Sequence, residues 1–276
     1  MRGVEVRLSI RVIAEAGENH VGDMGRAVEM VHAAASSGAD FVKFQSYSVD
    51  DLAPGTDADT REWVRRVQLS VDDHYLLSEA AGAAGITFLS TAVNVRWATF
   101  LQEMGCKSVK LASLSLTNEA LMMFVAERFD EVFISTGMGD EEEVGKALIM
   151  LGSKPRVTVL HCVSEYPLPD ARASLFSIPY LRERFGLPTG YSDHTIGVIA
   201  CIAATALGAE LIEKHFTLDK TLEGTDHILS ADPAELAQIA YGCKRVAVQL
   251  GAGGKAPTEK ELKGRQMMRS LFQERS

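Results

Sequence analysis

The stretch GYSDHT at residues 190–195, answered by LIEKHFT at residues 211–217, decides the fold. Each is a short run with a histidine beside a charged residue, and residues 197–209 between them are apolar, rich in Ala and Ile, and typical of a helix. This strand, helix, strand order predicts parallel strands whose carboxyl ends place His194 and His215 on one rim of a sheet. In α/β proteins that rim is where ligands bind.

The two histidines have two possible interpretations. Either one alone is more simply explained as a polar residue at a strand end whose hydrogen bonds are satisfied. Together, with Ser192, Asp193 and Glu213 beside them, they favour a site. Two neighbouring imidazoles can hold a divalent cation and leave positions open for substrate and water. The sequence therefore predicts a metal centre at His194 and His215.

The rest of the chain repeats the same alternation of short apolar runs, turn residues and amphipathic segments. Residues 46–70 are expected to form a long polar loop, whose length suggests a function. Further strands are expected at 10–16, 39–45, 86–91, 108–111, 132–136 and 157–162, and helices at 22–37, 72–84, 94–104, from 117, from 140, at 175–185 and at 233–249.

Eight such units in about 250 residues predict a (β/α)8 TIM barrel, an α/β fold, over residues 1–250. The alternative is a doubly wound open sheet, which normally has fewer strands and a Gly-rich turn that opens a helix. The glycines at 251–254 follow a helix instead, and they indicate a flexible exit from the domain into a tail at 251–276.

Composition narrows the class of protein. The chain has 276 residues, 46% of them hydrophobic, and a net charge of −9. A sizeable core is therefore available, and nucleic acid is not expected as a partner, although a local cationic pocket can still hold small anions. No run approaches the roughly eighteen apolar residues of a membrane span, and the start of the chain does not resemble a signal peptide. The four cysteines are widely spaced, which indicates free thiols in a reducing compartment. Together these features predict a cytoplasmic protein without membrane attachment.

Polar side chains end nearly every predicted strand. The lysines and hydroxyls among them suit a phosphorylated or carboxylated substrate, because Lys supplies a point charge and hydroxyls supply short donors. Singly, a lysine can extend to solvent and a Ser or Thr can cap the next helix. The recurrence favours a site, and the set comprises Glu15, Asn19, His20, Lys43, Gln45, Ser90, Thr91, Lys110, Ser113, Ser135, Thr136, His161, Ser164, Tyr166, Ser192, Asp193, His194, Glu213, Lys214 and His215.

In their order and spacing these motifs resemble the sialic acid synthase (NeuB) family, which includes the legionaminic and pseudaminic acid synthases and the SpsE proteins. The resemblance runs from about residue 10 to residue 271. Short pieces such as STGM are weak alone. The motifs are AEAG with NH at 14–20, KFQ at 43–45, KLAS at 110–113, STGM at 135–138, HCVSEYP at 161–167, SDHT at 192–195, EKHFT at 213–217 and GTDH at 224–227.

This resemblance implies a homodimeric synthase that condenses phosphoenolpyruvate with an open-chain N-acyl aldose, similar to N-acetylmannosamine, to give a nonulosonic 2-keto acid and phosphate. It implies a divalent metal, most often Mn²⁺ with Mg²⁺ or Co²⁺ as alternatives, bound by His194 and His215. By residue-by-residue matching, Glu15, Gln45, Tyr166 and Asp226 would face the sugar. Phosphoenolpyruvate would contact Lys43, Thr91, Lys110, Ser113, Ser135, Ser164 and Ser192.

The chemistry of these residue types agrees with the implied reaction. A metal can polarise the aldehyde as a Lewis acid, and lysines and hydroxyls can stabilise phosphate as the C–O bond breaks. Two histidines with oxygen ligands suit Mn²⁺, Mg²⁺ or Co²⁺ better than a closed zinc site. Glu15 or Asp226 can carry a proton or anchor a sugar hydroxyl. Adjacency suggests that Glu213 orients one of the histidines.

Two features depart from the family pattern. Where the family usually has an acidic residue that contacts the sugar, this chain has Ser115, which favours a nonstandard aldehyde acceptor as an alternative. The chain also ends at Ser276, after a linker-like segment at 255–271, without the antifreeze-like (SAF) domain expected from the family. Two other hypotheses are an aldolase or lyase with a Schiff-base lysine, and a non-catalytic barrel that binds phosphoenolpyruvate or a sugar phosphate.

Overall fold

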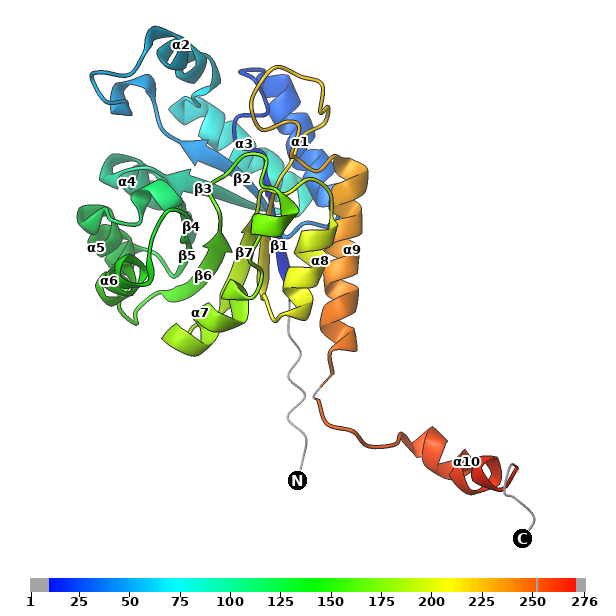
Figure 1. Ribbon diagram of the computed structural model, residues 1–276. Coiled ribbons are helices and arrows are strands. Elements are labelled where there is room, and N and C mark those ends of the chain that lie inside the picture. The colour runs from blue at the N-terminus through cyan, green and yellow to red at the C-terminus, as the bar shows by residue number, and fades with distance from the viewer. Residues whose placement is uncertain (1–9, 252, 272–276) are drawn as a thin grey trace.

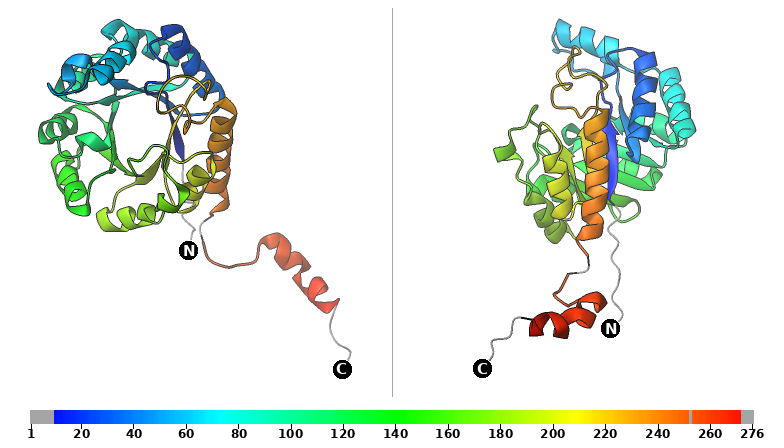
Figure 2. Two further views of the ribbon diagram at one scale, coloured as in Figure 1. Left: turned by 45° about the horizontal axis from the view of Figure 1, so that its top comes forward. Right: turned by 90° about the vertical axis from the view of Figure 1, so that its right-hand side faces the viewer.

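The computed structural model describes residues 10–251 and 253–271. Eight parallel strands close into a barrel in sequence order, and helices surround it (Figure 1, Figure 2). The predicted (β/α)8 TIM barrel is thus confirmed. The strands are β1 (Arg11–Glu15), β2 (Phe41–Ser46), β3 (Thr87–Ala92), β4 (Ser108–Leu111), β5 (Glu131–Ser135), β6 (Arg156–Cys162), β7 (Thr189–Asp193) and β8 (Leu211–His215).

The helices follow the strands closely, and most begin at a side chain that caps the free backbone N–H groups of the first turn. Asp140, for example, accepts from Glu143 N in a capping box. The helices are α1 (Met24–Ser36), α2 (Ala58–Val67), α3 (Val71–Ala84), α4 (Val95–Glu103), α5 (Glu119–Arg128), α6 (Glu141–Leu151), α7 (Ser177–Phe185), α8 (Ile199–Ala206), α9 (Pro233–Gln249) and α10 (Glu259–Ser270), with short 3-10 turns at Val49–Asp51, Ser113–Ser115 and Asp170–Arg172.

The lower part of the barrel interior is filled by a layer of apolar side chains, and polar side chains begin directly above it. Its side chains form a buried cluster separate from the main core: Ile13, Phe41, Leu89, Phe133, Leu160 and Leu211. Because successive strand residues alternate in direction, the residues two positions further on face the same interior. In β1, β2 and β8 these are Glu15, Lys43 and Glu213. The same strands that fill the barrel with hydrocarbon therefore end in charged side chains at its mouth.

A glycine in β7 lets the apolar layer close. A Cβ at Gly190 would collide with the Leu160 side chain and with the Leu211 carbonyl oxygen of the neighbouring strand. The interior is already filled at this position, so only a residue without a side chain fits.

The expectation of an irregular loop over residues 46–70 is wrong in part. This segment holds the 3-10 turn Val49–Asp51 and the helix α2, whose N-cap Asp57 accepts from Thr60 N. In α2 only Val64 and Val67 are buried, and charged residues make up much of the rest. So short an apolar stripe is hard to distinguish from a polar loop by periodicity alone.

The expected linker also contains a helix. Helix α10 begins at a capping box between Thr258 and Glu261, and Figure 1 shows it extending away from the barrel. Residue 252, in the predicted flexible exit, lies outside the described residues. Throughout residues 10–251 and 253–271, no helix combines the length and the apolar character needed to cross a membrane.

An ion cluster lies below the apolar layer, at the amino-terminal end of the barrel. Glu131 accepts from Arg11 Nη1 at 3.0 Å, from Arg11 Nη2 at 2.9 Å and from Arg156 Nε at 2.7 Å. The Arg11 guanidinium also lies over the Phe41 and Phe133 rings, 5.6 and 5.3 Å from their centroids. Burial raises the pKa of Glu131, but the hydrogen bonds and charges of Arg11 and Arg156 outweigh it and lower that pKa.

Glu131→Gln is expected to destabilise the fold by about 2–4 kcal/mol, because it leaves two guanidinium groups without their carboxylate. Since the folded-state pKa is lowered, this stabilisation is present above the ordinary carboxyl pKa of about 4.3 and is lost as pH falls through the lowered value. Urea unfolding from pH 7 to pH 3 measures both effects. Glu127→Gln, which removes an exposed pair with Lys154, is the control. Equal unfolding midpoints for the two variants would contradict the prediction.

Candidate active site

Two buried lysines at the carboxyl end of the barrel share one carboxylate. Lys43 Nζ lies 3.7 Å from Glu213 Oε2, and Lys110 Nζ lies 3.8 Å from Glu213 Oε1. Ser192 Oγ donates to Glu213 at 2.9 Å. Burial raises the pKa of Glu213, but Lys110 and Lys43 outweigh this and lower it to about 2. Glu213 is therefore an anion that holds two cations in place across the mouth.

The same two lysines also bind hydroxyls and a second carboxylate. Lys43 Nζ donates to Thr91 Oγ1 at 2.9 Å and lies 2.8 Å from Glu15 Oε2. Lys110 Nζ donates to Ser135 Oγ at 2.7 Å. The structure thus brings the predicted lysines and three of the predicted hydroxyls, those of Thr91, Ser135 and Ser192, into one connected cluster.

The hydroxyls of Ser113 and Ser164, also predicted for the site, lie close together beside Gly137. Its N–H donates to Ser113 Oγ at 3.0 Å, and a Cβ at this position would collide with the hydroxyls of Ser164 and Ser113. Only glycine allows hydroxyls from two loops to approach the backbone this closely. The cluster of lysines and hydroxyls therefore continues across the ends of β4, β5 and β6, a donor set suited to an anion.

The two predicted metal histidines are neighbours. Their ring centroids are 5.4 Å apart, and the Tyr166 ring lies 3.9 Å from that of His194. His194 Nδ1 is 2.7 Å from the Val163 carbonyl oxygen, which can only accept, so this nitrogen carries the proton and Nε2 keeps its lone pair. Burial, followed by the charge of His215, lowers the pKa of His194 to about 4, and burial lowers the pKa of His215 as well.

His215 has a free ring nitrogen. Its Nδ1 is buried with no hydrogen-bond partner in the described chain and lies 3.4 Å from Asp226 Oδ2. Metal ligation requires neutral imidazoles, and the lowered pKa values of His194 and His215 favour that form. Among the described residues, no three His, Cys, Asp or Glu side chains are grouped to hold a metal, so the protein side of this candidate site is the histidine pair.

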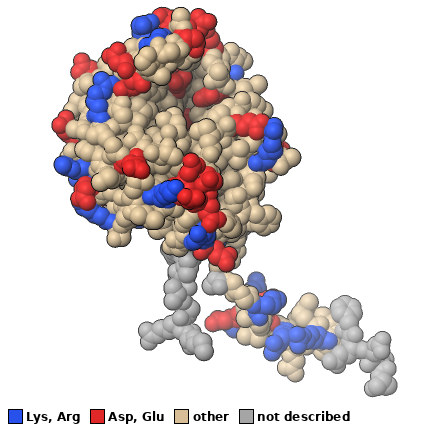
Figure 3. Space-filling view, turned by 60° about the vertical axis from the view of Figure 1, so that its left-hand side comes forward, with Lys and Arg blue, Asp and Glu red and all other residues tan. Residues whose placement is uncertain are grey.

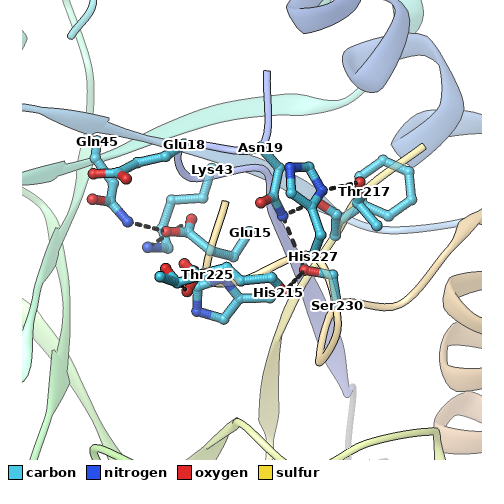
Figure 4. A network of polar contacts seen from close by, with 12 residues as sticks. Glu15, Glu18, Asn19, Lys43, Gln45, His215, Thr217, Thr225, His227 and Ser230 are labelled. Carbon is cyan, nitrogen blue, oxygen red and sulfur yellow. Dashed lines mark hydrogen bonds and ion pairs between the residues drawn. The ribbon is translucent and has the colours of Figure 1, made fainter. Parts of the chain in front are cut away.

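Of the four residues predicted to face a sugar, Glu15, Gln45 and Asp226 lie on the β1, β2 and β8 side, and Tyr166 lies in the loop after β6. Gln45 Nε2 donates to Glu15 Oε1 at 2.7 Å (Figure 4). Burial raises the pKa of Glu15, and this rise prevails over the opposing charge of Lys43. Tyr166 covers His194, and Asp226 faces His215, as described above. The residues that the resemblance assigns to the sugar therefore lie at the barrel mouth.

One residue of this mouth was missed from the sequence. Glu18 follows β1, and its carboxylate accepts from Tyr47 O–H and from Trp63 Nε1, the latter at 2.5 Å. The Trp63 contact depends on helix α2, which the sequence pattern did not reveal. The AEAG and NH motifs flank Glu18 without including it, so the only available signal was its position next to the first strand end.

Several other strand-end residues do not face the site. His161 Nε2 lies 2.8 Å from the Ala173 carbonyl oxygen and its ring stacks on Tyr191, on the outer side of β6. Asn19 donates to the Phe216 carbonyl oxygen, and Ser90 bonds to Ser46. For His161 and Ser90 the reason is the two-residue period of a strand, which sends alternate side chains toward the surrounding helices; Asn19 lies in the turn after β1.

The expectation that Glu213 orients a histidine is also wrong. Its hydrogen bond and ion pairs go to Ser192, Lys43 and Lys110, whereas the histidines face Val163 and Asp226. Glu213 points inward between the lysines, because it occupies the interior register that Lys43 and Lys110 also share.

Behind the histidines lies a fully buried ion pair. Asp193 and Lys214 are register partners on β7 and β8, and Lys214 Nζ lies 2.9 Å from Asp193 Oδ2, with both side chains 0% exposed. Lys214 also donates to the Thr195 carbonyl oxygen. Each residue immediately precedes a site histidine, so this pair joins the two strand ends at the point where the imidazoles project.

Asp193→Ala is expected to lower the free energy of unfolding by about 3–5 kcal/mol, because it leaves the Lys214 ammonium buried without a partner. Chemical denaturation monitored by circular dichroism measures this. Glu142→Ala, which breaks an exposed pair with Lys146, should change stability by less than about 1 kcal/mol. A similar loss of stability in both variants would show that the buried pair contributes no more to stability than the exposed pair.

The fold and site together define a barrel enzyme class with an anion-binding mouth beside a histidine pair. The NeuB family model matches residues 30–255, and the chain belongs to that family. It is 39% identical over 279 residues to the N,N'-diacetyllegionaminic acid synthase of Legionella pneumophila, covering 94% of this chain and 78% of that protein. It is 32% identical over 255 residues to the N-acetylneuraminate-9-phosphate synthase of Mus musculus, covering 87% of this chain and 71% of that protein.

A solved structure agrees with this assignment. The N-acetylneuraminic acid synthetase from Leptospira borgpetersenii, in complex with citrate, superposes with a TM-score of 0.89 at 34% identity. The superposition covers 95% of this chain and 92% of that one. The family resemblance read from the motifs is therefore confirmed.

Proposed function

We propose that this protein condenses phosphoenolpyruvate with an open-chain N-acyl aldose, giving a nonulosonic 2-keto acid and inorganic phosphate. Membership of the NeuB family and relatives named as legionaminic and sialic acid synthases support this. The observation that carries the proposal is the pair of buried lysines, Lys43 and Lys110, held by Glu213 next to two neutral histidines.

In this proposal the lysine and hydroxyl cluster binds phosphoenolpyruvate. Lys43 and Lys110 supply charge, and Thr91, Ser113, Ser135, Ser164 and Ser192 supply hydroxyl donors. As C3 of phosphoenolpyruvate forms a bond to the aldehyde carbon, the aldehyde oxygen becomes a hydroxyl. Water then adds at C2, and the C2–O bond breaks to release phosphate. Groups fixed on the phosphate stabilise the charge that develops on it without reorganising.

The carboxylates suit the proton transfers. Glu15, whose pKa burial raises, is held by Lys43 and Gln45 and can give a proton to the aldehyde oxygen or anchor a sugar hydroxyl. Asp226, beside His215, faces the same end of the site. Burial raises the pKa of Tyr166 well above its usual range, so this hydroxyl stays a donor toward the sugar.

His194 and His215 would hold a divalent cation, with Mn²⁺ first and Mg²⁺ or Co²⁺ as alternatives. The Val163 contact fixes the tautomer of His194, and no hydrogen bond within the described chain engages His215 Nδ1. When bound, the cation supplies Lewis acidity at the aldehyde oxygen. Two imidazole ligands, with oxygen ligands in the remaining coordination positions, favour these metals over structural zinc.

A second candidate for the acceptor is a nonstandard aldehyde. Ser115 is buried, and its Oγ has no partner in the described chain. A residue that brings no charge, where the family usually has an acid, supports a nonstandard aldehyde acceptor as the second candidate for the same reaction. A homodimer stays a prediction from the resemblance, and a cytoplasmic location stays a prediction from the sequence composition.

Phosphate release from phosphoenolpyruvate should require both Mn²⁺ and one N-acyl aldose, and chelator should abolish it. His194→Ala and His215→Ala are expected to lower the rate by at least about 100-fold, since loss of even an outer-shell partner of a metal ligand costs 10–100-fold. A coupled phosphate assay across a panel of aldoses measures this. His32→Gln, on the exposed face of α1, is the control. Release that survives chelator, or no release with any acceptor, would overturn the proposal.

Lys110→Met is expected to weaken binding of phosphoenolpyruvate by about 10- to 150-fold, the range for one charge-assisted hydrogen bond of about 1.5–3 kcal/mol. Titration calorimetry without acceptor measures it. Lys107→Met makes the same charge change at an exposed position and should leave binding within about 2-fold. Equal affinities for the two variants would place phosphoenolpyruvate elsewhere.

A further inference from the structure

Glu18 is a charged residue of the barrel mouth for which the reaction above has no role. It lies in the loop after β1, next to Gly17, whose backbone has a positive φ of 49°. A Cβ on Gly17 would come within 3.2 Å of Glu15 Oε1 and 3.4 Å of Gln45 Nε2. The turn therefore passes directly over the Glu15 and Gln45 pair and carries Glu18 to the rim beside them, as Figure 4 shows.

Donors from two other segments fix the Glu18 carboxylate. Tyr47 O–H, just beyond β2, donates to Oε1, and Trp63 Nε1, from α2, donates to Oε2. Burial raises the pKa of Glu18, while these two hydrogen bonds oppose the rise. One donor on each oxygen stabilises the charged form and leaves further lone pairs for a ligand.

Negative charge gathers at this end of the mouth. Asp226 and Glu15 are the two carboxylates whose charges act on Glu18, and the same three carboxylates act on Tyr47. The cations nearby are already engaged: Lys43 with Glu15 and Glu213, and Arg66 with Glu223 at 2.9 Å. The lysine and hydroxyl cluster lies instead toward β4, β5 and β6. The mouth therefore has a cationic end and a carboxylate end.

We propose that Glu18, held by Tyr47 and Trp63, is a specificity-determining residue that selects an uncharged acceptor aldose over the same aldose carrying a terminal phosphate. This rests on the proposed function, because it treats the carboxylate end as the acceptor subsite. Hydroxyls and an amide N–H can donate to Glu18 and Asp226. A phosphate dianion at the same place meets like charges, which suppresses binding of the wrong partner.

Glu18→Gln tests this, because glutamine keeps the shape and one oxygen acceptor but removes the charge. The matched control is Glu223→Gln, which makes the same charge change on the same rim, in a side chain that pairs outward with Arg66. Thermal unfolding establishes that both variants fold. The ligands are N-acetylmannosamine and its 6-phosphate. Titration calorimetry on the Mn²⁺-loaded protein gives dissociation constants without turnover, and phosphate release gives kcat/KM.

The wild-type protein is expected to bind the uncharged aldose about 100-fold more tightly than the phosphorylated one. Glu18→Gln should reduce that ratio by about 10-fold, mainly through tighter binding of the phosphate ester, and Glu223→Gln should leave it within about 3-fold. Equal binding of the two aldoses by wild type, no binding of either, or an unchanged ratio in Glu18→Gln would each overturn the proposal. If the preference in binding holds but no phosphate is released, the condensation reaction is wrong and the subsite survives.

Discussion

The mouth of this barrel depends on one carboxylate shared between two buried ammonium groups. Lys43 and Lys110 could not stay charged in a closed barrel without compensation, because burial alone favours their neutral forms. Glu213 lies between them. Together with Glu15 it raises the pKa of Lys43 against burial, whereas burial still lowers the pKa of Lys110. Glu213 belongs to the last strand and the lysines belong to the second and fourth. These ion pairs therefore connect three strands across the interior of the ring. In the proposed reaction, phosphoenolpyruvate would meet positive groups that are already in position.

The apolar layer below makes that balance possible. Side chains such as Phe133 and Leu160 fill the lower barrel and exclude water from beneath the charges. The ion pair of Asp193 with Lys214 has a parallel role on the outer side, where it joins the two strands that carry the histidines. Charge on the outer surface is distributed differently: on the face shown in Figure 3, acidic and basic side chains are interspersed over much of the barrel. The functional charge is concentrated inside.

The sequence predicted the barrel because each strand and helix is local and periodic. It predicted the lysines, hydroxyls and histidines of the site because strand ends share one rim. It did not separate inward from outward residues, since a shift of one position reverses a strand's faces. Thus His161 and Lys214 were predicted together with inward-facing residues such as Lys43, although their own side chains point outward. Glu18 was missed because its partners, Tyr47 and Trp63, are distant in sequence, and charges in α2 hide its narrow apolar stripe.

The closing seam of the ring has a consequence for folding. Strand β1 pairs with β8, with Arg11 opposite Leu211 and Glu15 opposite His215. Nearly the whole barrel sequence separates these partners, so the seam is among the contacts with the highest loop-closure entropy and is expected to form late. Lys110, Ser113, Ser135 and Ser164 lie within the middle of the chain, whereas the histidine pair lies at the ends of β7 and β8 and Glu15 lies across the seam on β1. A nascent chain can thus bring these hydroxyls together early, but the full set of polar side chains at the mouth is complete only when its two ends meet.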